Sequence, residues 1–390
     1  MPVLATKEHC TGCTACASGC PKGCITMETD ENGFLYPVID AERCVACGLC
    51  EKICPVVTPL KKVENAPKAY AAYSKDETVR MQSSSGGVFT EIAKAILAAG
   101  GVVYGAAYNE RFEVIHICVE TEADLAKLRG AKYAQSDLRG IFTEVKEKLD
   151  KGQHVLFSGT PCQVGGLKAY LRKEYEKLLT VDFVCHSVPS PMAWREYVKC
   201  RAQQDNGGQL PVSINLRSKQ SGWSRYRYSN LFRYSDGTEH AAKSGESLYM
   251  KLFVGGYIDR GSCENCAFKG YQRISDLTVG DFWGIWNIAP EMDDDKGTSV
   301  VLVQSDRGAE LMAQIGAQLV LKEVSLEEAS RENGAMLSAA KANPDRDKAL
   351  AQIRDGHIEA CASWVIPPKQ SLRQRLRSKG RSLLSRVLGK

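Results

Sequence analysis

The chain has 390 residues, of which 44% are hydrophobic and 25% are charged, values typical of a soluble globular protein with two or three domains. Its formal charge of +5 is uneven: Lys369–Lys390 carries eight Lys or Arg and no acidic residue, which leaves −3 (5 minus 8) elsewhere. The body has no basic stripe with interleaved aromatics, which argues against a nucleic-acid enzyme. The longest apolar run, Ala95–Tyr108, has 14 residues, too few to span a bilayer. Met1–Glu8 lacks the apolar stretch of a signal peptide, and many cysteines without a secretion signal predict a reducing cytoplasm.

Half of the sixteen cysteines fall in two copies of the spacing C-x2-C-x2-C-x3-C-P, 34 residues apart. In a two-cluster ferredoxin with this spacing, three cysteines of one run and the fourth of the other hold each [4Fe–4S] cluster, because the iron prefers soft thiolate ligands. A zinc ribbon or a disulfide scaffold is the alternative, but zinc sites seldom place four cysteines in one tight run, and nothing indicates secretion. The predicted ligand sets are Cys10, Cys13, Cys16 with Cys54, and Cys44, Cys47, Cys50 with Cys20.

Residues 1–58 are therefore predicted to form a small α+β ferredoxin module, and the polar, proline-bearing residues 59–68 to form a linker. Cys24 is a ninth cysteine in the module, and we expect it to be a small core residue rather than a ligand. Oxygen-sensitive clusters indicate an anaerobic host.

The segment 69–150 begins a larger domain. Apolar residues on one helical face predict a helix over Val88–Ala99, which Gly100–Gly101 ends before a strand. The preceding loop, Ser83–Gly87, is either a phosphate cradle, because helix N-terminal N–H groups favour an anion, or a serine-rich helix start without a ligand. Further along we expect a strand at 113–119, a short helix opened by Thr121 with Asp124 at the capping-box position, and a helix capped by Ser136 that ends near Gly152.

The segment 151–365 alternates between strand and helix patterns. Val155–Phe157 and Leu179–Val184 are predicted strands, and Thr160–Pro161 and Ser190–Pro191 are predicted to open the helices that follow them. This alternation favours an α/β domain with a parallel sheet. Asp236–Gly237 lies between alternating strand patterns and predicts a hairpin, so the whole is a mixed α/β domain.

Four more cysteines lie at positions that matter. Cys162 is in the first turn of a predicted helix, Cys185 follows a strand, and Cys263 and Cys266 form a lone C-x2-C. Strand ends and helix starts converge at the ligand crevice of an open α/β sheet. The four cysteines are therefore either a third [4Fe–4S] site, or a zinc or unligated C-x2-C plus two ordinary buried thiols. Gly280–Gly284 is an aromatic turn that either flanks a planar ring or fills a core corner.

These pieces, in order, resemble the beta subunit of coenzyme F420-reducing hydrogenase and dehydrogenase over residues 69–310, a family in which an N-terminal two-cluster ferredoxin is a common fusion. Ser187 stands where that family usually has glycine, a small change in a tight turn. The motifs that carry the resemblance are Ser85–Gly87, Gly130–Tyr133, Gly159–Gln163, Cys185–Pro191, Cys263-x2-Cys266 and Gly280–Gly284.

The resemblance implies an FAD-binding α/β domain that passes electrons between iron–sulfur clusters and an organic two-electron acceptor. It favours the third cluster over the other interpretations of Cys162, Cys185, Cys263 and Cys266. It also implies that the flavin or substrate pocket is lined by Ser85, Gly86, Gly87, Lys132, Lys219 and Trp223.

The resemblance leaves the acceptor open. The family includes ferredoxin-linked reductases that do not use coenzyme F420, and bacterial members whose genes stand beside polysaccharide genes. The acceptor is thus coenzyme F420 or an unidentified metabolite, and a soluble ferredoxin or a redox partner subunit is the expected donor. The alternatives are a non-catalytic electron-transfer subunit that wires a separate enzyme to ferredoxin and, disfavoured because no output module is visible, a redox sensor.

The basic tail, residues 366–390, places Leu372, Leu376 and Leu383 close to one helical face among arginines. This pattern indicates an amphipathic helix on an anionic membrane surface or on an acidic partner, and the alternative is a solvated tail. We expect a cytoplasmic protein with a peripheral contact at the inner membrane surface through this tail.

Overall fold

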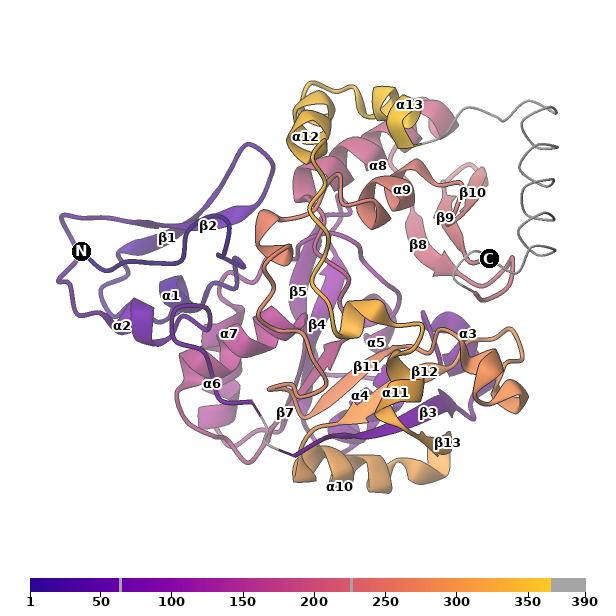
Figure 1. The fold of residues 1–390 in the computed structure, drawn as a ribbon, viewed down its shortest axis with the longest axis horizontal. Coiled ribbons are helices and arrows are strands. Elements are labelled where there is room, and N and C mark those ends of the chain that lie inside the picture. Colours follow the sequence, from indigo (N-terminus) through magenta and orange to yellow (C-terminus); the bar gives the residue numbers. More distant parts are fainter. Residues whose placement is uncertain (63–64, 225–226, 366–390) are drawn as a thin grey trace, which may run out of the picture.

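The computed structural model describes residues 1–62, 65–224 and 227–365 (Figure 1). The predicted tail, 366–390, and two residues of the predicted linker lie outside this described part. Among the described residues, no helix is both long and apolar enough to cross a membrane.

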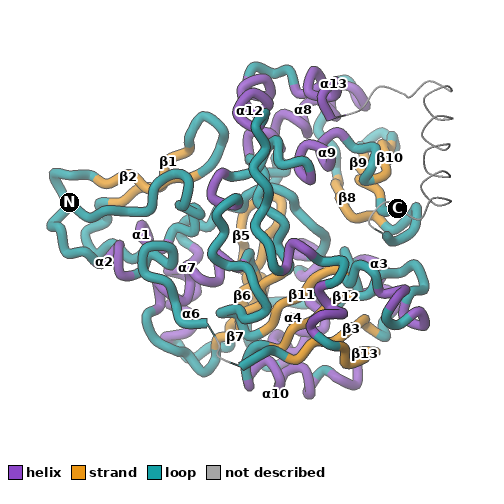
Figure 2. The backbone as a smooth tube through the Cα atoms, in the orientation of Figure 1, coloured by secondary structure: helices purple, strands orange, loops and turns teal. Residues whose placement is uncertain are grey.

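The N-terminal module is a small α+β unit beside the larger domain (Figures 1 and 2). Strands β1 (Ile25–Thr29) and β2 (Leu35–Ile39) pair antiparallel. Each cysteine run contains one short helix, α1 (Ala15–Ser18) in the first and α2 (Leu49–Lys52) in the second. The structure thus has the predicted ferredoxin-like module.

An eight-stranded mixed sheet forms the larger domain, with the order β13-β3-β12-β11-β7-β6-β4-β5. The four strands β11, β7, β6 and β4 pair parallel, and antiparallel strands flank them on both sides. This confirms the α/β prediction and its mixed character. The strands are β3 (Lys68–Ser74), β4 (Val102–Tyr108), β5 (Val114–Val119), β6 (Val155–Ser158), β7 (Leu178–Phe183), β11 (Leu277–Asp281), β12 (Ser299–Val303) and β13 (Leu319–Val324).

Helices cover both faces of this sheet, because its buried strands alternate side chains between two cores. Val103 packs with α4 and α10, whereas Val102 and Tyr104 pack with α6 and α7. The predicted start of α7 is confirmed: Thr160 forms a capping box with Gln163, and proline occupies the first turn. The sheet helices are α3 (Glu77–Gln82), α4 (Val88–Ala98), α5 (Leu125–Leu128), α6 (Ile141–Asp150), α7 (Pro161–Leu171), α10 (Asp306–Gln314) and α11 (Leu326–Ser330).

A third layer of structure has its own aromatic core, which includes Trp194, Tyr197, Phe232 and Tyr249. The predicted hairpin at Asp236–Gly237 is confirmed, and the predicted cap Ser190 precedes α8. The elements here are α8 (Pro191–Asn206), β8 (Ser213–Ser218), β9 (Ser229–Arg233), β10 (Glu239–Lys243), α9 (Leu248–Val254), α12 (Arg346–Arg354) and α13 (Ala362–Val365).

Two predicted helix starts are wrong. The short helix α5 begins at Leu125 with Asp124 as its N-cap, although Thr121 and Asp124 do form the predicted side-chain pair, in which the Asp124 N–H donates to the Thr121 hydroxyl. Ser136 does not cap α6, which begins at Ile141. The reason is that the segment before it runs beside β5, where His116 N–H donates to Asp137 O and Asp137 N–H donates to Val114 O.

Candidate functional site

Four cysteines of the module line one pocket: Cys10, Cys13 and Cys16 from the first run and Cys54 from the second. Cys10 and Cys13 precede α1, Cys16 lies within it, and Cys54 follows α2. The rest of the lining is mostly apolar and includes Leu4 and Met27. The structure therefore brings together the crossed set that the sequence predicts for one cluster, around a space with the thiol donors that iron prefers.

The second predicted set packs beside the first, since Cys16 touches the same small core. Cys20, Cys44 and Cys50 pack in one small core with Cys24, and Cys47 is exposed. Cys24 is buried, as expected of a core residue, yet its sulfur lies 3.3 Å from the sulfur of Cys20.

A second pocket collects the four cysteines of the larger domain, Cys162, Cys185, Cys263 and Cys266. Three segments contribute to this pocket: Cys162 is in the first turn of α7, Cys185 lies shortly after the end of β7, and the loop of Cys263 and Cys266 completes the lining. Arg260, Lys269 and Arg273 also line the pocket and make its wall positive. Sequence spacing left this site open between a third cluster and a zinc or unligated C-x2-C plus two ordinary buried thiols, and in the structure all four cysteines line one pocket.

Burial shapes the chemistry of these thiols. It raises the pKa of Cys13, Cys162 and Cys185 to about 12. Without a metal these thiols keep their protons at neutral pH, so loading of iron would release protons. Among the described residues, no group of three His, Cys, Asp or Glu lies close enough to hold a single metal ion.

The two pockets are neighbours. Thr11 lines both of them. Helix α7 packs directly on the module, because Gly166, one turn beyond Cys162, lies so close to Cys13 that an added Cβ would be 2.8 Å from the Cys13 sulfur. The first cysteine run thus packs against the helix that carries Cys162.

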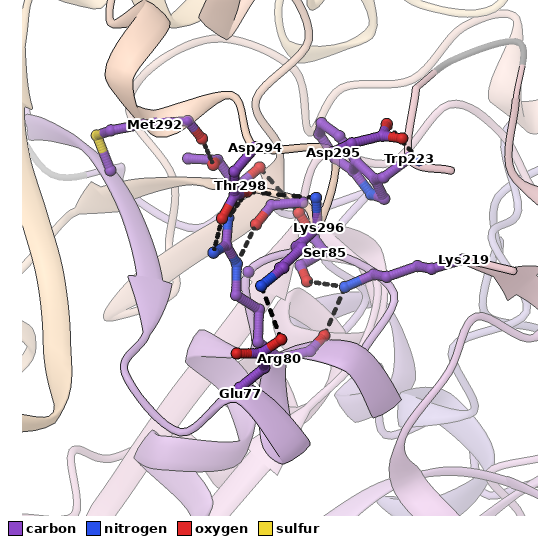
Figure 3. A network of polar contacts seen from close by, with 12 residues as sticks. Glu77, Arg80, Ser85, Lys219, Trp223, Met292, Asp294, Asp295, Lys296 and Thr298 are labelled. Carbon is purple, nitrogen blue, oxygen red and sulfur yellow. Dashed lines mark hydrogen bonds and ion pairs between the residues drawn. The ribbon is translucent and has the colours of Figure 1, made fainter. Parts of the chain in front are cut away.

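A separate polar network surrounds the Ser83–Gly87 loop (Figure 3). The Lys219 ammonium donates to the carbonyls of Arg80 and Ser85, at 2.5 and 2.7 Å. The Trp223 indole donates to Ser84 O at 3.1 Å. Three of the predicted flavin residues, Ser85, Lys219 and Trp223, therefore come together although they lie far apart in the sequence.

Part of this loop is occupied by contacts within the protein. The Ser85 hydroxyl donates to Thr298 O, and the Gly86 N–H donates to the Ser299 hydroxyl. An added Cβ at Gly86 would lie 2.4 Å from Ala72 O, so close packing alone requires glycine there. Gly87 is the N-cap of α4 and supplies no side-chain cap. A ligand at this loop would therefore meet the backbone N–H groups in the first turn of α4 rather than the Ser85 hydroxyl.

Sequence reasoning missed the buried ion pair beside this network. Arg217, 4% exposed, forms two hydrogen bonds with Asp281, at 2.7 and 2.9 Å, and also donates to Tyr133 and Ser84. Asp281 and Trp283 belong to the aromatic turn Gly280–Gly284, and Trp283 stacks on Trp223 with ring centres 5.0 Å apart. Of these two residues, only Asp281 could have been found from the sequence, because it lies in that motif, whereas Arg217 stands in no recognisable pattern.

Lys132 is connected to this network only indirectly. Its ammonium donates to the carbonyls of Lys127 and Arg129, at 3.0 and 2.7 Å, at the end of α5. The next residue, Tyr133, is the one that contacts Arg217. Burial lowers the pKa of Lys132 to about 7, and burial with the nearby Arg80 and Arg217 lowers the pKa of Lys219 to about 7.

Family models match three parts of the chain. Residues 9–57 match a 4Fe-4S dicluster domain, residues 69–142 match the N-terminal part of the coenzyme F420 hydrogenase/dehydrogenase beta subunit, and residues 152–329 match its C-terminal part. The fold and these matches define an iron–sulfur protein of the electron-transfer oxidoreductases. The chain belongs to the family of coenzyme F420 hydrogenase/dehydrogenase beta subunits, with an N-terminal dicluster domain.

Two curated relatives and one solved structure are similar to this chain. One component of the F420H2 dehydrogenase of Methanosarcina mazei is 30% identical over 46% of this chain and 53% of its own length. Coenzyme F420-dependent sulfite reductase of Methanocaldococcus jannaschii is 30% identical over 41% of this chain and 24% of its own length. The chain thus spans about half of the first relative and about a quarter of the second. A chain of the F420-reducing [NiFe] hydrogenase complex of Methanosarcina barkeri aligns over 81% of this chain and 97% of its own length, at 16% identity and a TM-score of 0.47.

Proposed function

We propose that the protein is an iron–sulfur flavoprotein oxidoreductase that passes electrons from three [4Fe–4S] clusters to FAD and on to an organic two-electron acceptor. The acceptor is coenzyme F420 or another metabolite. The module holds two clusters, with the crossed ligand sets given above. Cys162, Cys185, Cys263 and Cys266 hold the third.

The contact between the two cysteine pockets carries this proposal. One-electron transfer requires closely spaced centres, and the pockets share Thr11 in their walls. Cys47 is the exposed cysteine of the second predicted set, which makes that cluster the entry point for a soluble ferredoxin or a redox partner subunit. The order of sites then runs from the surface, through the module, into the sheet domain.

The network around Ser85 is the proposed flavin site. Bound FAD would supply the conversion between one-electron and two-electron chemistry. The first turn of α4, which Gly87 opens, would receive an anionic part of the cofactor, and the Lys219 ammonium would add positive charge. Gly86 would shape the loop by its close packing, since its N–H already donates to the Ser299 hydroxyl. The Trp223–Trp283 stack would fix a planar ring. Lys132 would act from the adjoining segment, through Tyr133.

A second candidate function is that of an electron-transfer subunit without chemistry of its own. The observation that favours it is the name of the Methanosarcina mazei relative, which is one subunit of a dehydrogenase. Both candidates place the protein in the cytoplasm of an anaerobe. We also propose that residues 366–390 make a peripheral contact with the membrane. The organic acceptor, if it is not coenzyme F420, would belong to polysaccharide synthesis.

The test is flavin reduction in the full-length protein purified anaerobically. Reduced ferredoxin should bleach the flavin absorbance of the wild type. The double variant Cys263→Ser, Cys266→Ser should keep its flavin but lose about four irons and the bleaching. Cys361→Ser, a buried thiol away from the pockets, is the control and should behave as wild type. Bleaching at an unchanged rate in the double variant would refute the third relay site.

A further inference from the structure

Arg260 lies between the two cysteine pockets and contacts both. It lines the pocket of Cys162, Cys185, Cys263 and Cys266. Its Nε donates to the carbonyl of Cys10, the first cysteine of the module, at 2.8 Å. The side chain is only 1% exposed, so water does not reach the guanidinium.

The other nitrogens of Arg260 complete a clamp on the module. Nη2 donates to Leu35 O at 2.9 Å, and Nη1 donates to the Gln135 side-chain oxygen at 2.8 Å. Gln135 in turn donates to Thr11 O at 3.2 Å, which is the residue that both pockets share. Glycine at position 12 allows the guanidinium to come this close to the module. Gly12 has φ +67°, and an added Cβ there would lie 2.9 Å from Arg260 Nη1.

No carboxylate in the described part of the chain forms an ion pair with Arg260, although the buried Asp259 is its neighbour in the chain. All three acceptors are neutral oxygens, and among the described residues no Asp or Glu lies within salt-bridge distance of it. The ring of Tyr36 lies 4.2 Å from the guanidinium carbon. A buried and unpaired cation is strongly unfavourable, whereas a [4Fe–4S] core with four thiolate ligands carries net negative charge. Clusters in the two pockets would compensate the guanidinium from both sides.

We propose that Arg260 is the positioning and tuning residue between the first-run cluster and the cluster of the sheet domain. Its hydrogen bonds fix the spacing of the two pockets, and its charge raises both reduction potentials, because a cation stabilises the more negative reduced form. This inference rests on the proposed function, since it requires a cluster in each pocket.

The experiment compares reduction potentials, measured by anaerobic redox titration with electron paramagnetic resonance, in full-length variants. Arg260→Gln removes the charge, and Arg260→Lys keeps the charge but loses the three-way fork. Gln135→Glu leaves Arg260 in place and sets a carboxylate against it. Arg201→Gln, which removes a cation ion-paired with Asp205 on α8, is the matched control.

We expect Arg260→Gln and Gln135→Glu to shift the reduction equilibrium of both flanking clusters about tenfold toward the oxidised form, which is 59 mV for one electron. The cluster of Cys20, Cys44, Cys47 and Cys50 should not shift, nor should any cluster in Arg201→Gln. Arg260→Lys should have the reduction potentials of the wild type, because it keeps the charge. Protease should nevertheless cleave the module from this variant faster than from wild type, because the three-way hydrogen bonding is lost. If Arg260→Gln loses its iron, the reduction potentials of Gln135→Glu test the inference in its place.

Unchanged potentials in a variant that holds about twelve irons would overturn the inference and leave the proposed function standing. About eight irons in the wild type would instead show that the third cluster is absent, which would contradict both the inference and the proposed relay. The iron count therefore separates the two failures.

Discussion

Substitution of Gly166 by alanine tests the contact between α7 and the ferredoxin module. The new Cβ would lie 2.7 Å from the Cys13 Cβ and 2.8 Å from its sulfur. At these distances either α7 or the Cys13 segment must shift. Cys13 is buried and belongs to the same core as α7, so it cannot turn into solvent. Overpacking of this kind costs about 1–3 kcal/mol. We therefore expect the free energy of unfolding to fall by about 2 kcal/mol, close to a 30-fold loss in the folding equilibrium.

The assay is anaerobic urea denaturation followed by circular dichroism, with iron release measured in parallel. The control is Gly316→Ala, because a Cβ at Gly316 meets nothing within 4 Å and its backbone is not left-handed. Gly166→Ala should also release iron faster from the module, since Cys13 is one of the predicted ligands. A Gly166→Ala protein with the stability and iron retention of Gly316→Ala would refute this packing of α7 against Cys13.

Three further predictions concern buried charges. Arg217→Met leaves Asp281 without its ion-pair partner and should lower the free energy of unfolding by about 3–5 kcal/mol, measured by urea denaturation; wild-type stability would contradict the pairing. The pKa of Lys219 is lowered to about 7, so FAD affinity, measured by fluorescence titration, should fall as pH rises from about 7 to about 9 and the ammonium loses its proton. Lys219→Met should bind FAD weakly at every pH, and a persisting pH dependence would exclude Lys219 as its cause. Burial raises the pKa of Asp182 to about 6, so the folded chain binds the proton more tightly than the unfolded chain and stability should decline as pH rises from about 4 to about 6. Asp182→Asn should abolish that decline in thermal unfolding, and an equal slope in both proteins would show that another group titrates.

Local signals in the sequence predicted much of this fold. Thr160 and Pro161 mark a helix start by capping chemistry that depends only on neighbouring residues, and α7 begins there. The crossed cysteine runs predicted a pocket with Cys54 beside Cys10, and the structure has that pocket. Ser136 failed as a cap because backbone pairing with β5, a long-range interaction, took precedence over local propensity.

The contacts that join distant segments were beyond sequence reasoning. Arg260 and Cys10 are 250 residues apart, and Arg217 and Asp281 are 64 apart. A single buried arginine leaves no periodic pattern and looks like any surface cation until the fold places it. The same holds for the shared wall of the two cysteine pockets, which depends on how the module docks on α7.

The most direct test of the whole account is the cofactor content of the wild-type chain. The protein would be purified anaerobically, and iron, acid-labile sulfide and released flavin quantified per chain. The account predicts about twelve irons with matching sulfide, together with one FAD. About eight irons and no flavin would contradict it and leave a two-cluster electron carrier that serves a separate enzyme.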